Sequence, residues 1–237
     1  MKKSYVIILF VLIPFLLLAG KTNAGIKFGM NFATLKGFGT EYGDNLAESL
    51  NAEDDYSSFK SSNATRKPLT AGLFVAHELT KKISLQGELG ISNKGISIKT
   101  DGLYDDQKLT LTTIYKVNYL DIPLLVKLNI SKEKNNRLNI YFGPSLSMLS
   151  SSKIYLKAKM GEEEDDDEID VTGYNETDYG LNFGFEAIMS SNMIFDCRYT
   201  LGMTNILDGE LEATDDRNGD TVDYKNSVFN ISIGFGF

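Results

Sequence analysis

Hydrophobic and polar residues alternate along much of the chain, most clearly in its last ten residues. From Phe229 to Phe237 every second residue is large and apolar, and the residues between them are polar or small. Successive side chains of a strand point to opposite sides, so this alternation predicts a β-strand with one apolar face. The segment 26–33 repeats the pattern at the other end of the sequence.

Six further segments follow the same alternation, so we expect eight strands. They are 26–33, 69–76, 83–92, 119–128, 138–143, 179–187, 193–202 and 228–237. Short, turn-like connections join the second and third, the fourth and fifth, and the sixth and seventh of these segments. The other connections are long, at about 36–67, 100–108, 150–177 and 206–225.

Short and long connections that alternate strictly are typical of a barrel that crosses an outer membrane, with its short turns in the periplasm. In lipid an unpaired sheet edge is costly, so the first and last strands must pair. We therefore predict an all-β fold for 25–237: an eight-stranded, antiparallel, up-and-down transmembrane β-barrel with four long outer loops and three short periplasmic turns. A soluble periplasmic β-sandwich that binds a ligand is the structural alternative, but it does not explain the order of the loops.

The first 24 residues have the three parts of a secretory signal peptide. Lys2 and Lys3 precede an apolar run over 5–18, and Ala24 offers a small residue for cleavage. A transmembrane anchor is the alternative, but the run is shorter than the roughly 20 residues that a spanning helix needs. We expect export, cleavage after Ala24, and localisation to the outer membrane of a gram-negative bacterium.

Composition excludes several classes of function. The formal net charge of −8 argues against a nucleic-acid partner, because no basic face is available for phosphate. The single cysteine, Cys197, and the single histidine, His77, exclude thiolate or multi-histidine metal sites. Without a second histidine, no catalytic triad can be assembled from a known pattern, which argues against an enzyme. An enzyme acting on lipid is the rival, and it would need a nucleophile and base near the outer rim.

Charged residues occupy several positions that the alternation directs into the barrel. The predicted lumen charge network is Lys27, Glu78, Glu88, Asp121, Lys127, Glu186, Asp196 and Arg198. A barrel of eight strands is narrow enough for side chains to fill it, and buried charges persist when they are paired. We interpret the network as structural filling; a binding or proton-relay site is the alternative.

Two of the predicted outer loops are candidates for cation binding, with calcium as the only candidate cofactor. The acidic run after Gly161 includes Glu163, Asp165 and Asp167, which offer carboxylate oxygens to a hard cation. A solvated loop that keeps the surface negative is the alternative. The second candidate is an incomplete calcium-loop pattern that contains Asp216, Asn218 and Asp220.

Several segments resemble the PorT-type outer-membrane β-barrel family. They are 25–32, 117–125, 141–145, 199–206 and 230–237, of which 117–125 (Val-Asn-Tyr-Leu-Asp-Ile-Pro-Leu-Leu) is the most specific. The resemblance covers nearly all of 25–237 and implies a small barrel in a gram-negative outer membrane. It implies no activity. One type of member assists protein secretion, but no residue here maps that role.

The expected function is therefore non-enzymatic: a filled barrel that is structural, or that binds a surface ligand or protein partner through acidic outer loops. An accessory part of a secretion or envelope-assembly machinery is the alternative. The expected partners are outer-membrane lipids and, during insertion, the barrel assembly machinery.

Overall fold

The computed structural model describes residues 21–36, 40–53, 55–131, 136–171, 173–207 and 224–237. Its elements are β1 Thr22–Lys36, α2 Thr40–Asn51, β2 Tyr56–Ala64, β3 Leu69–Glu78, β4 Ile83–Tyr104, β5 Gln107–Asn129, β6 Arg137–Met160, β7 Glu163–Asp170, β8 Thr177–Ile188, β9 Met193–Gly202 and β10 Lys225–Gly236. The ten strands form one antiparallel sheet. Each of the eight predicted segments corresponds to one of these strands, and the described residues contain two further strands, β2 and β7, and a helix.

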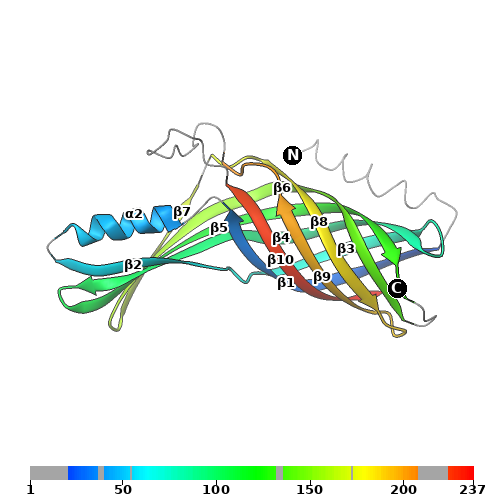
Figure 1. The fold of residues 1–237 in the computed structure, drawn as a ribbon, viewed down its shortest axis with the longest axis horizontal. Coiled ribbons are helices and arrows are strands. Elements are labelled where there is room, and N and C mark those ends of the chain that lie inside the picture. The colour runs from blue at the N-terminus through cyan, green and yellow to red at the C-terminus, as the bar shows by residue number, and fades with distance from the viewer. Residues whose placement is uncertain (1–20, 37–39, 54, 132–135, 172, 208–223) are drawn as a thin grey trace.

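Most of the strands pair in a closed ring. Going round it, β1 pairs with β3, β3 with β4, β4 with β5, β5 with β6, β6 with β8, β8 with β9, β9 with β10, and β10 with β1. The first and last strands pair over twelve positions, from Gly25 opposite Gly236 to Lys36 opposite Lys225. The ring is the barrel at one end of the elongated molecule, and its pairing leaves no free edge (Figure 1).

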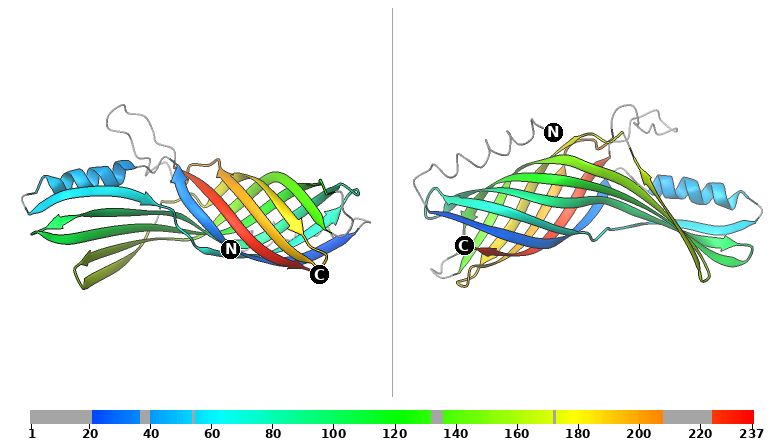
Figure 2. Two further views of the ribbon diagram at one scale, coloured as in Figure 1. Left: turned by 60° about the horizontal axis from the view of Figure 1, so that its bottom comes forward. Right: turned by 180° about the vertical axis from the view of Figure 1, so that it is seen from behind.

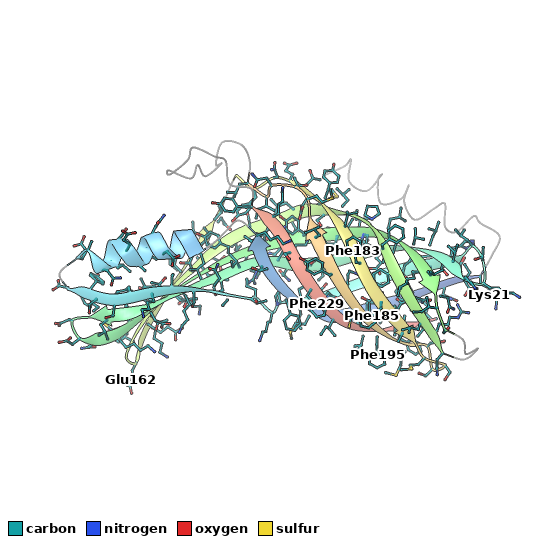
Figure 3. All side chains as sticks on the ribbon, in the orientation of Figure 1. Lys21, Glu162, Phe183, Phe185, Phe195 and Phe229 are labelled. Carbon is teal, nitrogen blue, oxygen red and sulfur yellow. The ribbon has the colours of Figure 1, made fainter. Side chains whose placement is uncertain are left out.

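The outer surface of the barrel is apolar, as the alternation predicts. Phe183, Phe185, Phe195 and Phe229 point away from the ring (Figure 3) and are between 42% and 51% exposed. Other large apolar side chains share this outward direction: Phe28, Leu73, Ile91, Phe142, Ile231, Ile233 and Phe235. No helix among the described residues is long and apolar enough to cross a membrane.

Three strands continue far beyond the barrel. β4, β5 and β6 have 22, 23 and 24 residues, and their distal parts remain paired. β2 adds to β4 on one side, and β7 adds to β6 on the other. We call this five-stranded part, made of β2, β7 and residues 95–104, 107–116 and 150–160, the extension sheet; it projects from one end of the barrel (Figure 2).

The extension sheet corrects three of the predicted loops. The segment 36–67 contains α2 and β2, and 150–177 contains the end of β6 and all of β7. The segment 100–108 is a tight hairpin in which Asp105 and Asp106 alone separate β4 from β5. Both aspartates have positive φ, 47° and 59°, which suits a two-residue hairpin turn. Of the predicted loop 206–225, residues 208–223 lie outside the described residues.

Helix α2 packs on one face of the extension sheet. A Cβ on Gly43 of the helix would lie 2.2 Å from Ser61 Oγ, so only glycine permits this close approach. Nearer the barrel, an apolar cluster joins the two parts of the molecule. It contains Leu35, Ile96, Ile98, Tyr115 and Ile206, all less than 9% exposed.

The predicted signal peptide lies mostly outside the described residues, which begin at Lys21. The predicted cleavage site falls within β1, where Thr22 is opposite His77 of β3. Cleavage after Ala24 therefore remains a prediction, and it would shorten β1 by three residues.

Candidate functional site

Six of the predicted lumen residues meet inside the barrel. They are Lys27 of β1, Glu88 of β4, Lys127 of β5, Glu186 of β8, and Asp196 and Arg198 of β9. We call these six the lumen network. It contains three cations and three carboxylates, so its formal charges balance.

Lys27 is the centre of the lumen network. Its Nζ lies 3.2 Å from Glu88 Oε1, 3.1 Å from Glu186 Oε2 and 2.8 Å from Asp196 Oδ2. Lys127 donates to the other oxygen of Glu186 at 2.5 Å. These side chains are nearly inaccessible to solvent, with Glu186 at 0% and Asp196 at 1% exposure. Burial removes their hydration, so each charge depends on its partners.

Tyr141 of β6 completes the lumen network, and alternation alone did not single it out. Its hydroxyl donates to Asp196 Oδ1 at 2.9 Å and accepts from Arg198 Nε at 3.2 Å. Gly184 makes room for the ring, because a Cβ there would lie 2.4 Å from the tyrosine oxygen.

Two cavities border the lumen network. One of about 70 Å³ is lined by Lys27, Glu88 and Arg198, together with residues nearer the extension sheet. The other, of about 320 Å³, is lined by Lys127 and Glu186 and extends toward the short turns. Both are large enough and polar enough to hold ordered water.

Asp121 belongs to a different cluster from the one predicted. Its Oδ1 lies 3.3 Å from the Nζ of Lys94, which also donates to Ser147 Oγ at 2.8 Å. Asp178 Oδ2 is 3.8 Å from the same Nζ and accepts a hydrogen bond from Asn226 at 2.8 Å. Two carboxylates therefore share one lysine, so the cluster of Lys94, Asp121 and Asp178 carries a formal excess of one negative charge.

Sequence reasoning missed Lys94 and Asp178 because the predicted strand 83–92 ended before Lys94 and the predicted strand 179–187 began after Asp178. Lys94 continues the inward-facing positions of Ser84 to Ser92, and Asp178 directly precedes the predicted strand 179–187. Glu78, also predicted for the lumen network, instead pairs with Arg137 near the short turns. His77 forms a hydrogen bond with Thr22 Oγ1 at 3.0 Å.

The candidate cation ligands Glu163, Asp165 and Asp167 lie in strand β7 and not in a loop. At alternate positions of an extended strand, successive ligands are about 6.8 Å apart along the chain and do not curve around one ion. Among the described residues there is no group of three or more His, Cys, Asp or Glu side chains suited to a metal. Asp216, Asn218 and Asp220 lie outside the described residues.

Lysines of β6 compensate the other side of β7. Lys153 forms an ion pair with Glu168 and lies 3.6 Å from Asp170, while Lys157 Nζ lies 3.7 Å from Glu164 Oε1. The hydrogen bond from Lys153 lowers the pKa of Glu168, with help from the hydroxyl of Tyr155. The same hydrogen bond raises the pKa of Lys153.

A family model described as "Outer membrane protein beta-barrel domain" matches residues 19–208. No curated protein matches the sequence. Among solved structures, the attachment invasion locus protein Ail of Yersinia pestis is 11% identical with a TM-score of 0.37, covering 93% of this chain and 100% of that chain. The outer membrane protein OprG of Pseudomonas aeruginosa is 13% identical with a TM-score of 0.39, covering 92% and 96%. Similarity at these levels supports no argument about function.

Proposed function

The chain belongs to the family of outer membrane protein beta-barrel domains, and from this premise we propose that it is a filled, non-enzymatic barrel that presents the extension sheet as a binding surface. Such a protein resides in the gram-negative outer membrane. Within the family, we propose that it is a PorT-type barrel, and the resemblance of the segment 117–125 supports this assignment. Eight strands form the spanning unit in this proposal, and outer-membrane lipids cover its apolar surface.

The continuity of β4, β5 and β6 carries this proposal. β4 and β5 stay paired from the barrel into the extension sheet, from Gly90 opposite Asp121 to Tyr104 opposite Gln107. β5 and β6 also stay paired into the extension sheet, with one register shift between Asn118 and Tyr119. Residues that reach far from the membrane are therefore held in fixed register and not on separate loops. In Figure 3, Glu162 marks the tip of the β6–β7 hairpin, and Lys21 lies at the opposite end of the molecule. Short turns of such barrels face the periplasm, so the extension sheet faces the outside of the cell.

The lumen network supports a filled barrel. It ties β1, β4, β5, β8 and β9 together across the interior with paired, buried charges. A small barrel packed in this way leaves no continuous aqueous path. In planar lipid bilayers the purified protein should therefore give no stable conductance steps. Steady, ohmic steps from the wild-type protein would contradict the filled lumen.

The non-enzymatic part of the proposal is supported by the position of the single histidine. His77 bonds to Thr22 at the end of β3 that leads into the short turn, far along the strand from the extension sheet. A lipid-directed active site would require its base near the outer rim.

Single cysteines test the proposed orientation. Asp105→Cys lies at the tip of the β4–β5 hairpin, and Ser190→Cys lies in the turn between β8 and β9. A membrane-impermeant maleimide should label Asp105→Cys on intact cells and Ser190→Cys only after permeabilisation. The wild-type protein, which has only Cys197, measures the background. The reverse labelling pattern would contradict a surface-exposed extension sheet. Insertion itself is expected to use the barrel assembly machinery.

A further inference from the structure

Strand β7 is an edge of the extension sheet. It pairs with β6 along its whole length, and in the described part of the chain it pairs with no other strand. All eight of its residues are exposed. An edge strand of this kind offers a row of backbone donors and acceptors to an incoming strand.

The two faces of β7 differ in how their charge is compensated. Glu164, Glu168 and Asp170 face lysines of β6, as described above. On the other face, the register places Glu163 opposite Met160, Asp165 opposite Ala158 and Asp167 opposite Leu156. We call these three acidic residues the uncompensated face, since their cross-strand neighbours are apolar.

The same face also exposes apolar surface. Leu156 is 38% exposed and Ile169, two positions after Asp167, is 44% exposed. Carboxylates beside apolar side chains suit lysine and arginine, because their long aliphatic stems cover apolar surface while the charged end reaches an acid.

The open edge of β7 has a defined set of backbone groups. The N–H of Val171 donates to Ser152 O of β6 at 3.2 Å. In an antiparallel pair these groups alternate in direction along the strand. Residues 163, 165, 167 and 169 therefore direct their N–H and C=O toward β6, and 164, 166, 168 and 170 direct theirs toward the open edge.

We propose that β7 docks a cationic, extended segment of a partner protein, which adds as a further strand and places lysine or arginine on the uncompensated face. Charge complementarity identifies this occupant. Strand β6 already pairs with β7 as a lysine-bearing strand. Its residues Lys153, Lys157 and Lys159 share one face and lie opposite acidic residues of β7. A second copy of this chain would bring one β7 against another and oppose acidic residues along the whole strand. This proposal rests on the proposed function, because it names the class of partner that the extension sheet would bind.

A peptide that alternates lysine and threonine is the probe for this site, with a block peptide of identical composition as its control. Binding to the full chain, folded in detergent micelles, is followed by fluorescence anisotropy. The alternating peptide should bind more tightly than the block peptide, and high salt should weaken it, because the ion pairs are exposed. If the two peptides bind equally well, the acidic strand acts only as diffuse negative charge and the proposal is wrong.

Matched triple variants separate the two faces. Glu163→Gln/Asp165→Asn/Asp167→Asn neutralises the uncompensated face, and Glu164→Gln/Asp166→Asn/Asp170→Asn removes the same charge from the other. The first should weaken binding about tenfold, as expected for the loss of three exposed ion pairs, and the second clearly less. Equal losses would overturn the proposal.

A proline tests strand addition. Asp166→Pro removes an N–H that faces the open edge and no hydrogen bond to β6, so it should weaken binding beyond Asp166→Asn. Equal binding by these two variants would overturn strand addition. Self-association of the wild-type chain that the first triple variant abolishes would instead identify a second copy as the occupant. Failure of any of these tests leaves the labelling of Asp105→Cys unchanged, so it is distinguishable from failure of the proposed function.

Discussion

Arg198 and Glu88 form a two-point ion pair inside the barrel, with Nη1 2.7 Å from Oε2 and Nη2 2.7 Å from Oε1. They come from β9 and β4, which are not neighbours in the sheet. The planar guanidinium matches the two carboxylate oxygens in a way that a lysine cannot. This pair therefore links distant parts of the barrel wall through its interior.

Replacement of Arg198 by methionine should destabilise the barrel strongly. The substitution leaves Glu88 buried with fewer partners, and the loss of one member of a buried pair costs about 3–5 kcal/mol. Urea unfolding in detergent measures the change in the free energy of unfolding. Arg198→Lys, which keeps the charge and loses the two-point geometry, should lose less. Wild-type stability of Arg198→Met would show that the pair does not hold the barrel together.

Gly184→Ala should disturb the lumen network without changing any charge. The new Cβ would lie 2.4 Å from both the Tyr141 oxygen and the Cys197 carbonyl, so the ring must shift from its contact with Asp196. Overpacking of this kind costs roughly 1–3 kcal/mol, measured by the same urea unfolding.

Gly236→Ala is the control for that substitution. It lies in the same sheet, and the nearest heavy atom to its new Cβ would be 3.8 Å away. It should therefore unfold like the wild-type protein. Equal effects of the two alanines would indicate a general penalty for side chains in these strands and not a specific contact with Tyr141.

Alternation predicted the barrel wall because lipid and lumen impose opposite requirements on successive residues. Phe183 and Phe229 had to face outward, and Glu186 and Arg198 had to face inward, wherever the strand crossed the membrane. Beyond the membrane that requirement ends. The sequence 95–116 has threonine, lysine and aspartate among its apolar residues, so its alternation is weaker.

The acidic strand β7 was the least predictable element. Eight acidic residues in nine positions suggest repulsion and a solvated loop. The structure shows that lysines of β6 lie opposite three of these residues, Glu164, Asp166 and Asp170, whereas apolar residues of β6 lie opposite Glu163, Asp165 and Asp167. The order of pairing across a hairpin decides whether such a run is compensated, and composition alone does not contain that information. For the same reason, sequence could assign Asp121 to the lumen but not to the cluster of Lys94.

The ion pair between Lys153 and Glu168 predicts a pH window for the β6–β7 hairpin. The pKa of Glu168 is lowered from its ordinary 4.5, so its contribution to stability is complete above that pH and is lost as pH falls through the lowered value. The pKa of Lys153 is raised from its ordinary 10.5, so its contribution is complete below that pH and is lost as pH rises through the raised value.

Carbon-13 NMR titration of the Glu168 carboxyl checks the acid side of this window. In Lys153→Met, the midpoint should move up toward the ordinary glutamate value, because the hydrogen bond from Lys153 is the largest cause of the shift. Lys108→Met, which removes the same charge at the start of β5, serves as the control. An unchanged midpoint in Lys153→Met would contradict the assigned pair.

Ile98→Ala should loosen the extension sheet while the barrel stays closed. Ile98 is 2% exposed and belongs to the apolar cluster that joins the two parts, and truncation of a buried isoleucine costs about 2–5 kcal/mol. The barrel has its own ring of pairing and its own lumen network, so the two parts can open separately. Hydrogen exchange should therefore rise at the amides of α2 and the distal part of β4, with no change at β8 and β9. Ile91→Ala, on the same strand but 61% exposed on the barrel surface, should leave the exchange of α2 unchanged. If Ile98→Ala instead accelerates exchange throughout β8 and β9, the barrel and the extension sheet unfold as one unit.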